Sequence, residues 1–191
     1  MLASDSDLPA VGGPGAGEAQ RYSDPRADRL RAAYLSAFGG SAYPVPVERI
    51  AEDLLGLEIC EGPLEVSGMI VPLERRIWLK EDEPADRKRF TLAHELGHWV
   101  CQCLEGRGEA VMCRIAEVDP DLADAVQRAA EREANIFAKE LLMPADAVRT
   151  AWQELGDVAA CAQRFAVSTE ALHWRLFNMQ LVGDRPEPYA G

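Results

Sequence analysis

Histidine, basic residues and long apolar runs are all scarce in this sequence of 191 residues. Lysine and arginine together number 20 against 32 aspartates and glutamates, so the formal net charge is −12. A charge of this sign repels phosphate backbones and anionic lipid, which disfavours direct binding of nucleic acid or of a membrane surface. No apolar run approaches the roughly 18–20 residues that a membrane span requires. Because hydrophobic residues nevertheless make up 48% of the chain, the sequence predicts a soluble, globular protein.

The use of cysteine and the character of the N-terminal segment both favour a reducing compartment. The N-terminal segment has neither the basic region nor the apolar region of a secretory signal, so export is not expected. Five cysteines form an odd set, which fits reduced thiols better than a disulfide framework. A thiolate metal site at Cys101, Cys103 and Cys113 is a weak alternative, because a single residue between paired cysteines is less than the usual spacing. We therefore expect a cytoplasmic protein whose cysteines are small core residues.

Apolar periodicity and turn residues predict an α+β fold that is rich in helix. Residues 1–22 have no apolar period and are predicted to form a flexible arm. A main domain is expected at 23–156, followed by a helical pair at 157–183 that packs on the core and a tail at 184–191. Within the main domain we expect helices at 24–40, 47–57, 85–104, 121–144 and 144–155, and strands at 57–60, 64–72 and 76–80. The three strands are expected to form a small antiparallel sheet.

Two of the three histidines lie in one short motif, His94-Glu95-Leu96-Gly97-His98. The pattern H-E-x-x-H falls in a segment that is predicted to be helical on independent grounds. Residues four apart on a helix are separated by about 6 Å along the axis and only about 40° around it, so both imidazoles can converge on one ion. Glu95 lies about 100° around the helix from His94, where it can act on a water molecule beside the metal. The motif predicts one catalytic zinc ion bound by His94 and His98, with Glu95 as the general base.

A catalytic zinc site needs a third protein ligand and one open position for water. The next long helix offers Glu131 and Glu133, which differ by about 200° around the axis, so only one of them can face the metal. Helical periodicity alone leaves this choice open. The apolar stripe of that helix consists of Ala130, Ala134, Phe137, Ala138 and Leu141. The stripe borders Glu131 and Asn135 more closely than Glu133. We therefore assign Glu131 as the third ligand and expect Glu133 to face solvent. Asn135 is expected to hold the free ring nitrogen of one ligand histidine.

The motifs in these two helices are similar to those of the ImmA/IrrE family of zinc metallopeptidases, which belongs with the gluzincins. The likeness rests on HELGH preceded by RFTLA and on E-x-x-A-N-x-F-A-x-E-L-L-M-P in the second helix, and it extends over about residues 44–182. In this family the motif histidines and the first glutamate of E-x-x-A-N bind zinc, and these positions correspond to His94, His98 and Glu131. The catalytic glutamate of the family corresponds to Glu95.

The expected function is zinc-dependent hydrolysis of peptide bonds in a specific protein. The resemblance implies a minimal gluzincin-like zinc peptidase at 23–156, and a substrate that is a helix-turn-helix transcriptional repressor whose loss activates stress or mobile-element genes. The segment RIWLK at 76–80 is a candidate sheet edge to which a peptide could add as a strand, although core packing explains Ile77 and Leu79 at least as well. The alternative function is a zinc-stabilised regulatory or interaction module that does not hydrolyse peptides and that could associate with DNA.

The last two helices, expected at 158–167 and 168–179, have the outline of a helix-turn-helix, with Ser168 as a suitable N-cap. The residues expected on the outer face are Thr169, Glu170, His173, Arg175 and Asn178. One arginine beside a glutamate is too little positive charge to hold DNA, so we expect this pair to pack against the core. His173 is assigned a surface or packing role in preference to a catalytic one.

Overall fold

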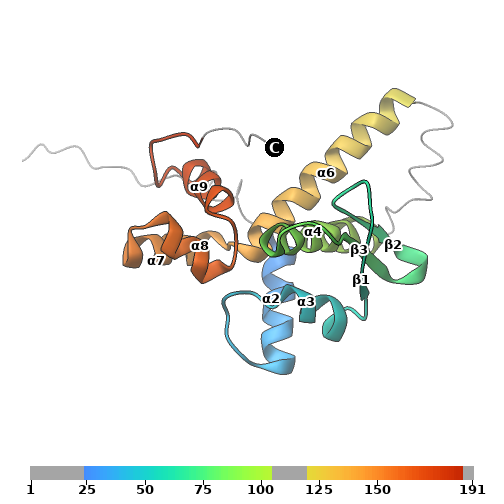
Figure 1. Cartoon of the computed structure of the whole chain (residues 1–191), viewed down its shortest axis with the longest axis horizontal. Helices are drawn as coiled ribbons and strands as arrows, with labels where there is room; N and C mark the ends of the chain where they lie inside the picture. The colour runs from blue at the N-terminus through green and yellow to red at the C-terminus, as the bar shows by residue number, and fades with distance from the viewer. Residues whose placement is uncertain (1–23, 105–119, 187–191) are drawn as a thin grey trace, which may run out of the picture.

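The structure, a computed structural model, describes residues 24–104 and 120–186. The flexible arm expected at 1–22 and the last residues of the expected tail, 187–191, lie outside the described residues. Helices dominate and one small three-stranded sheet accompanies them, so the predicted α+β class is confirmed (Figure 1). Within the described ranges, none of the helices has both the length and the apolar composition that crossing a bilayer would require.

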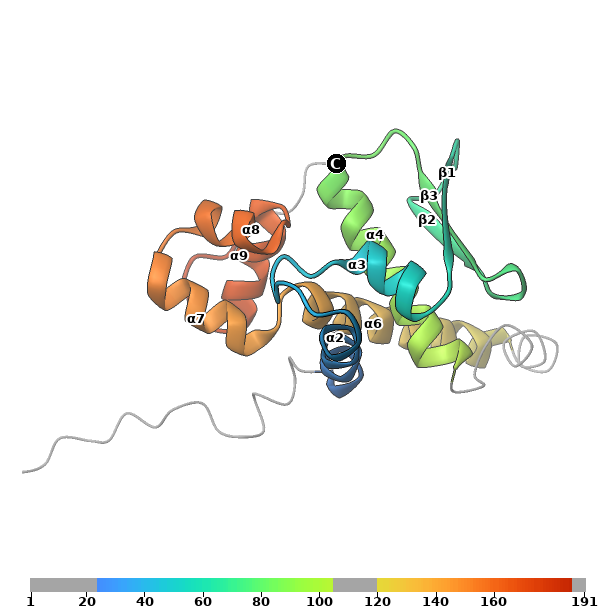
Figure 2. The same ribbon diagram turned by 90° about the horizontal axis from the view of Figure 1, so that it is seen from below.

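The long helices α4 (Ala85–His98) and α6 (Pro120–Leu142) form the centre of the molecule. The sheet lies on one side of this pair, against α4, and the C-terminal helices lie on the other side (Figure 1 and Figure 2). Four residues of the predicted apolar stripe on α6 are fully buried: Ala134, Phe137, Ala138 and Leu141. This stripe packs α6 against α4, and α4 continues beyond its last residue into the π-helical turn η4 (Trp99–Cys103).

The N-terminal part of the described chain packs against this pair. Helix α2 (Pro25–Phe38) has proline at its first position, and the Asp24 side chain caps it by accepting a hydrogen bond of 2.8 Å from the backbone N–H of Arg26. Helix α3 (Val47–Arg49) is a single short turn that continues into the π-helical turn η2 (Ile50–Leu54), where one regular helix was expected.

The order of the strands corrects the prediction of a purely antiparallel sheet. The elements here are β1 (Glu58–Gly62), β2 (Gly68–Val71), the 3₁₀ turn η3 (Pro72–Glu74) and β3 (Arg76–Lys80). The order is β1-β3-β2, with β2 antiparallel to β3 and β1 parallel to β3. The short η3 connection makes the hairpin between β2 and β3. The loop at 63–67 carries the chain across the end of the sheet, so that β3 is inserted between its two predecessors.

The central position of β3 also contradicts the edge role considered for residues 76–80. Both edges of β3 are paired, so no peptide can add to it. Ile77 and Leu79 are buried, as the core-packing interpretation of this segment requires. The strand with the most buried side chains therefore takes the centre, and β1 and β2 are the edges.

The three C-terminal helices are α7 (Ala145–Leu155), α8 (Val158–Phe165) and α9 (Thr169–Asn178), close to their expected ranges. Ser168 caps α9, since its hydroxyl accepts a hydrogen bond of 3.1 Å from the backbone N–H of Ala171. Phe165, Leu172 and Leu176 are fully buried and belong to the same apolar cluster as the core residues of α4 and α6. The division into a domain at 23–156 and a pair at 157–183 stays a prediction.

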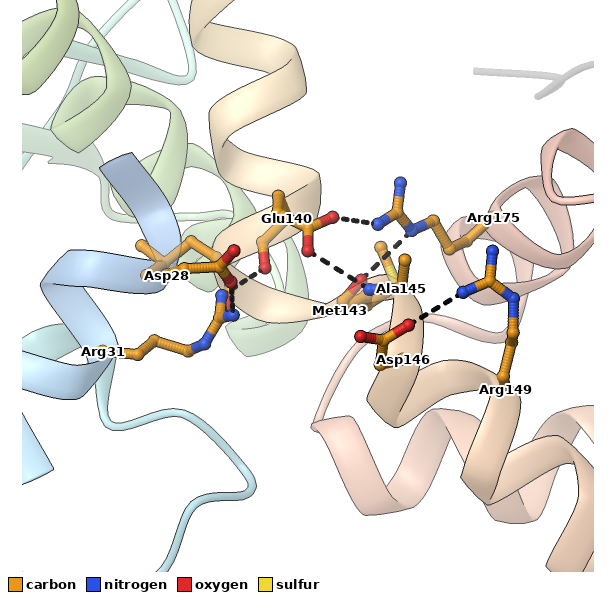
Figure 3. A network of polar contacts seen from close by, with 9 residues as sticks. Asp28, Arg31, Glu140, Met143, Ala145, Asp146, Arg149 and Arg175 are labelled. Atoms are coloured by element: carbon orange, nitrogen blue, oxygen red, sulfur yellow. Dashed lines mark hydrogen bonds and ion pairs between the residues drawn. The ribbon is translucent and has the colours of Figure 1, made fainter. Parts of the chain in front are cut away.

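Arg175 does not lie on the outer face of α9, where it was expected. Its side chain is buried and forms an ion pair with Glu140 of α6, and its Nε donates to the carbonyl of Met143 at 3.1 Å (Figure 3). Glu140 also accepts from the backbone N–H of Ala145 at 3.2 Å, and its own carbonyl accepts from Arg31 of α2 at 2.6 Å. The Glu140 carboxylate and the Met143 carbonyl hold this arginine in the interior, where it cannot contact a phosphate backbone.

Candidate metal centre

Three polar side chains meet between α4 and α6. His94 and His98 lie one turn apart on α4, and their Nε2 atoms are 3.0 Å apart. Glu131 of α6 approaches both rings, with carboxylate oxygens 3.2 Å from Nε2 of His94 and 3.5 Å from Nε2 of His98. Among the residues that the structure describes, this is the one group of histidine, cysteine or acidic side chains arranged to share a metal ion.

The donor set of this group fits a zinc ion. With bonds of roughly 2.0–2.1 Å in a tetrahedral arrangement, ligand atoms lie about 3.3 Å from one another, close to the separations between these three side chains. Two imidazoles and one carboxylate are a common set of ligands at catalytic zinc sites. The imidazole side chains are 17% exposed and the Glu131 side chain is 42% exposed, so the group is accessible from solvent on the α6 side. A catalytic site needs such access, whereas a purely structural zinc site is closed.

Asn135 of α6, the residue one turn after Glu131, also contacts the side chain of His94. His94 forms a hydrogen bond with the Asn135 side chain, and the amide of Asn135 donates to the carbonyl of Glu131 at 2.9 Å. Burial and the neighbouring His98 lower the pKa of His94 below its ordinary value, despite the opposing effect of Glu131. A neutral imidazole is the form that binds a metal ion.

Sequence reasoning missed the partner of the other histidine and misplaced Glu133. Nδ1 of His98 lies 2.9 Å from Oε1 of Gln102, and Nε2 of Gln102 donates to Glu133 at 3.1 Å. The assignment of Glu133 to solvent is therefore wrong: its carboxylate also pairs with Arg26 of α2 at 3.0 Å. The spacing of four residues between His98 and Gln102 could have revealed the first of these contacts. Gln127, likewise missed, donates to Glu131 at 2.7 Å.

Glu95 is a buried carboxylate at the junction of α4 and the sheet. Its side chain is turned toward β2, where the backbone N–H of Ile70 donates to it, and the residue is 7% exposed. Burial raises the pKa of Glu95 to about 7; the charge of Glu131 acts in the same direction, and His98 and the Ile70 N–H act against it. The structure thus places a carboxyl group beside the His94, His98 and Glu131 cluster but outside it.

The other sequence candidates lie elsewhere. His173 is on α9, at the end of the molecule away from the sheet, and is not part of the cluster (Figure 2). Cys101 and Cys103 lie in η4 and join no group of possible metal ligands in the described part of the chain. Cys113 lies outside the described residues.

Gly97 sets the distance between α4 and α6, the two helices that carry His94, His98 and Glu131. A Cβ atom at this position would lie 2.8 Å from Cα and 2.9 Å from the carbonyl oxygen of Ala134 on α6. Because backbone atoms cannot rotate away, Gly97→Val must force the helices apart, and we expect it to lower the free energy of unfolding by about 2–3 kcal/mol in urea titrations. Gly183→Val is the matched control, since a Cβ there meets nothing within 4 Å. Equal stability of the two variants would contradict this close approach.

Comparison with known families agrees with the geometry of this site. The family model described as Peptidase_M78, IrrE N-terminal-like domain, matches residues 59–177, a range that includes the whole of α4 and α6. The chain belongs to this family. The IrrE N-terminal-like domain is thus a metallopeptidase-type domain, and the resemblance inferred from the two helical motifs is confirmed.

Comparison with solved structures identifies a fold shared with a protein titled "Mycobacterium tuberculosis transcriptional regulator". The TM-score is 0.58 at 17% sequence identity, and the match covers 82% of this chain and 47% of that one. The IrrE N-terminal-like chain therefore spans about half the length of this structural relative, and the likeness concerns the fold alone. Comparison with curated proteins gave no significant match.

Proposed function

We propose that this protein is a zinc-dependent endopeptidase that cleaves a specific protein substrate in the cytoplasm. The observation that carries the proposal is the convergence of three donor atoms, from His94, His98 and Glu131, within 4.8 Å of one another beside the buried carboxyl group of Glu95. Metal ligands alone would support a structural site. The addition of a carboxyl group that lies next to the ligands without joining them favours catalysis.

Each residue has a distinct role in the proposed reaction. His94, His98 and Glu131 would hold the metal ion, and Asn135 would orient the ring of His94. When bound, zinc supplies a Lewis acid that activates water and polarises the carbonyl of the scissile peptide bond. Glu95 accepts a proton from the attacking water as the new C–O bond forms. It then delivers this proton to the amine nitrogen as the C–N bond breaks.

The substrate would bind in an extended conformation along strand β2. Among the described residues this strand pairs only with β3, so its other edge keeps backbone groups for a peptide beside the Ile70 N–H, which donates to Glu95. The hydrogen bond from Ile70 to Glu95 shows that this strand borders the proposed catalytic carboxyl group. Main-chain hydrogen bonds at a strand edge would position the scissile bond and tolerate varied side chains.

A helix-turn-helix transcriptional repressor is the proposed substrate, by resemblance to the ImmA/IrrE peptidases. The acidic character of this chain, with a net charge of −12, supports a protein substrate that is itself basic, as DNA-binding domains are. The burial of Arg175 in its pair with Glu140 argues against direct contact of α9 with DNA.

The test uses purified, zinc-loaded protein and the repressor-like protein encoded nearest to it in the genome. Intact-mass spectrometry is expected to find two fragments of the repressor after incubation, and no fragments when a chelator removes the zinc. A repressor that stays whole with the loaded protein, in a mixture where the two proteins nevertheless bind one another, would instead support a regulatory module without hydrolytic activity.

A further inference from the structure

A continuous line of polar contacts runs from the metal centre to the first turn of α2. Nδ1 of His98 contacts Oε1 of Gln102 at 2.9 Å, and Nε2 of Gln102 donates to Oε2 of Glu133 at 3.1 Å. The other oxygen of Glu133, Oε1, accepts from Nη1 of Arg26 at 3.0 Å. These contacts join α4 and η4, α6 and α2. None of the residues behind His98 belongs to the proposed catalytic group.

The chemistry of these groups fixes the direction of every hydrogen bond. An ionised carboxylate only accepts, so the Gln102 amide must present its NH₂ group to Glu133. Its oxygen then faces His98 and can only accept, so Nδ1 of His98 must carry the proton. In a neutral imidazole this leaves Nε2 without a proton, and its lone pair points toward His94 and Glu131.

Arg26 and Asp24 hold Glu133 in the position that this arrangement requires. Arg26 binds Asp24 through two contacts, Nη2 to Oδ2 at 2.8 Å and Nε to Oδ1 at 3.1 Å. Asp24 is buried and also caps α2, which fixes the guanidinium relative to the helix. The guanidinium is permanently charged and donates to Glu133 from this fixed position.

We propose that Glu133 is a positioning residue that selects the metal-binding tautomer of His98 through Gln102, and that Arg26 fixes Glu133 for this task. The inference rests on the proposed role of His98 as a metal ligand, and it does not require that the protein cleaves any particular substrate. It assigns the two ligand histidines different supports: Asn135 for His94, and the path through Gln102, Glu133 and Arg26 for His98.

The first test measures the zinc dissociation constant by competition with a chromogenic chelator. In Glu133→Gln the new side chain can donate as well as accept, so the Gln102 amide is free to turn over and the preference for one tautomer is lost. We expect zinc affinity to fall by about 10–100-fold, the usual effect of removing a group that orients a ligand. Gln102→Met, which removes the path but keeps the volume, is expected to give a similar loss and carries the test if Glu133→Gln does not fold.

The control is Glu48→Gln, which removes a carboxylate that binds Arg89 of α4 at 3.0 and 3.1 Å, away from His98. Its zinc affinity should match that of the unchanged protein. If Glu48→Gln weakens zinc binding as much as Glu133→Gln does, the effect is a general loosening of α4 and the proposal is overturned. It is also overturned if both Glu133→Gln and Gln102→Met bind zinc as tightly as the unchanged protein.

The second test reads the tautomer directly from ring ¹⁵N chemical shifts in the metal-free protein, at a pH where its imidazoles are neutral. The unchanged protein should show His98 protonated at Nδ1, and Glu133→Gln should shift the ring toward the tautomer protonated at Nε2. An unaltered His98 spectrum in Glu133→Gln would overturn the proposal. Because neither readout uses a substrate, a protein that binds zinc but cleaves nothing would refute the peptidase function and leave this inference standing.

Discussion

Glu95→Gln is expected to abolish peptide hydrolysis while leaving the bound zinc in place. The amide has the size of the carboxyl group, and its oxygen can still accept the hydrogen bond from Ile70, so the surroundings should not rearrange. An amide cannot take a proton from water, and the loss of a positioned general base costs about 10²–10⁴-fold in rate. Intact-mass spectrometry of the repressor measures the cleavage, and the zinc content of the same sample measures whether the metal stays bound.

Glu58→Gln is the matched control for this substitution. Glu58 lies on β1, its side chain is 60% exposed, and it pairs with Arg76 rather than with any member of the His94, His98 and Glu131 group. Cleavage should continue at the original rate in this variant. Rapid cleavage by zinc-loaded Glu95→Gln would show that some other group takes the proton, and it would refute the role of Glu95 as the general base.

Glu131→Ala is expected to lose zinc rather than merely to react slowly. Loss of an orienting group already costs about 10–100-fold in metal affinity, so removal of a direct ligand should cost more than about 100-fold. Zinc should therefore raise the melting temperature of the unchanged protein, because it binds the folded state, and should raise that of Glu131→Ala little or not at all. Thermal unfolding with and without added zinc measures this difference.

Asp124→Ala controls for the loss of a negative charge from the same helix. Asp124 is exposed on α6, about two turns before Glu131. Zinc should raise the melting temperature of Asp124→Ala as much as it raises that of the unchanged protein. A Glu131→Ala protein that zinc stabilises fully would exclude this carboxylate as a ligand.

The helices and the central motif follow from local sequence, and this is why they could be predicted. The spacing of His94 and His98 has meaning only on a helix, and the apolar stripe on α6 decides which of its glutamates faces that helix. The choice of Glu131 over Glu133 depended on the helical spacing of the apolar residues of α6. In the structure the stripe residues are fully buried: Ala134, Phe137, Ala138 and Leu141. Both features depend only on the spacing of residues along a single helix, which can be read from the sequence.

Strand order could not be obtained in the same way. Each of the three strands is short, and alternation of side chains does not say which strand is central. The insertion of β3 between β1 and β2 depends on where the loop at 63–67 carries the chain, and no local signal in that loop specifies it. The expectation of an antiparallel sheet was correct only for the pair joined by a tight turn.

The contacts of Glu133 were hidden for a related reason. A helical projection of α6 places Glu133 on a different face from Glu131, but it ignores the approach of α2 and of the π-helical turn after α4. Arg26 lies 107 positions away along the chain, and Gln102 lies 31 positions away. Polar side chains that far apart in sequence can be paired only once the fold is known.

Anomalous diffraction at the zinc absorption edge, from crystals of the zinc-loaded protein, tests the central claim most directly. We expect a single peak about 2.0–2.1 Å from Nε2 of His94, from Nε2 of His98 and from a carboxylate oxygen of Glu131, with a fourth position open to solvent. A peak bound elsewhere, or one that Glu131 does not approach, would contradict the proposed metal centre.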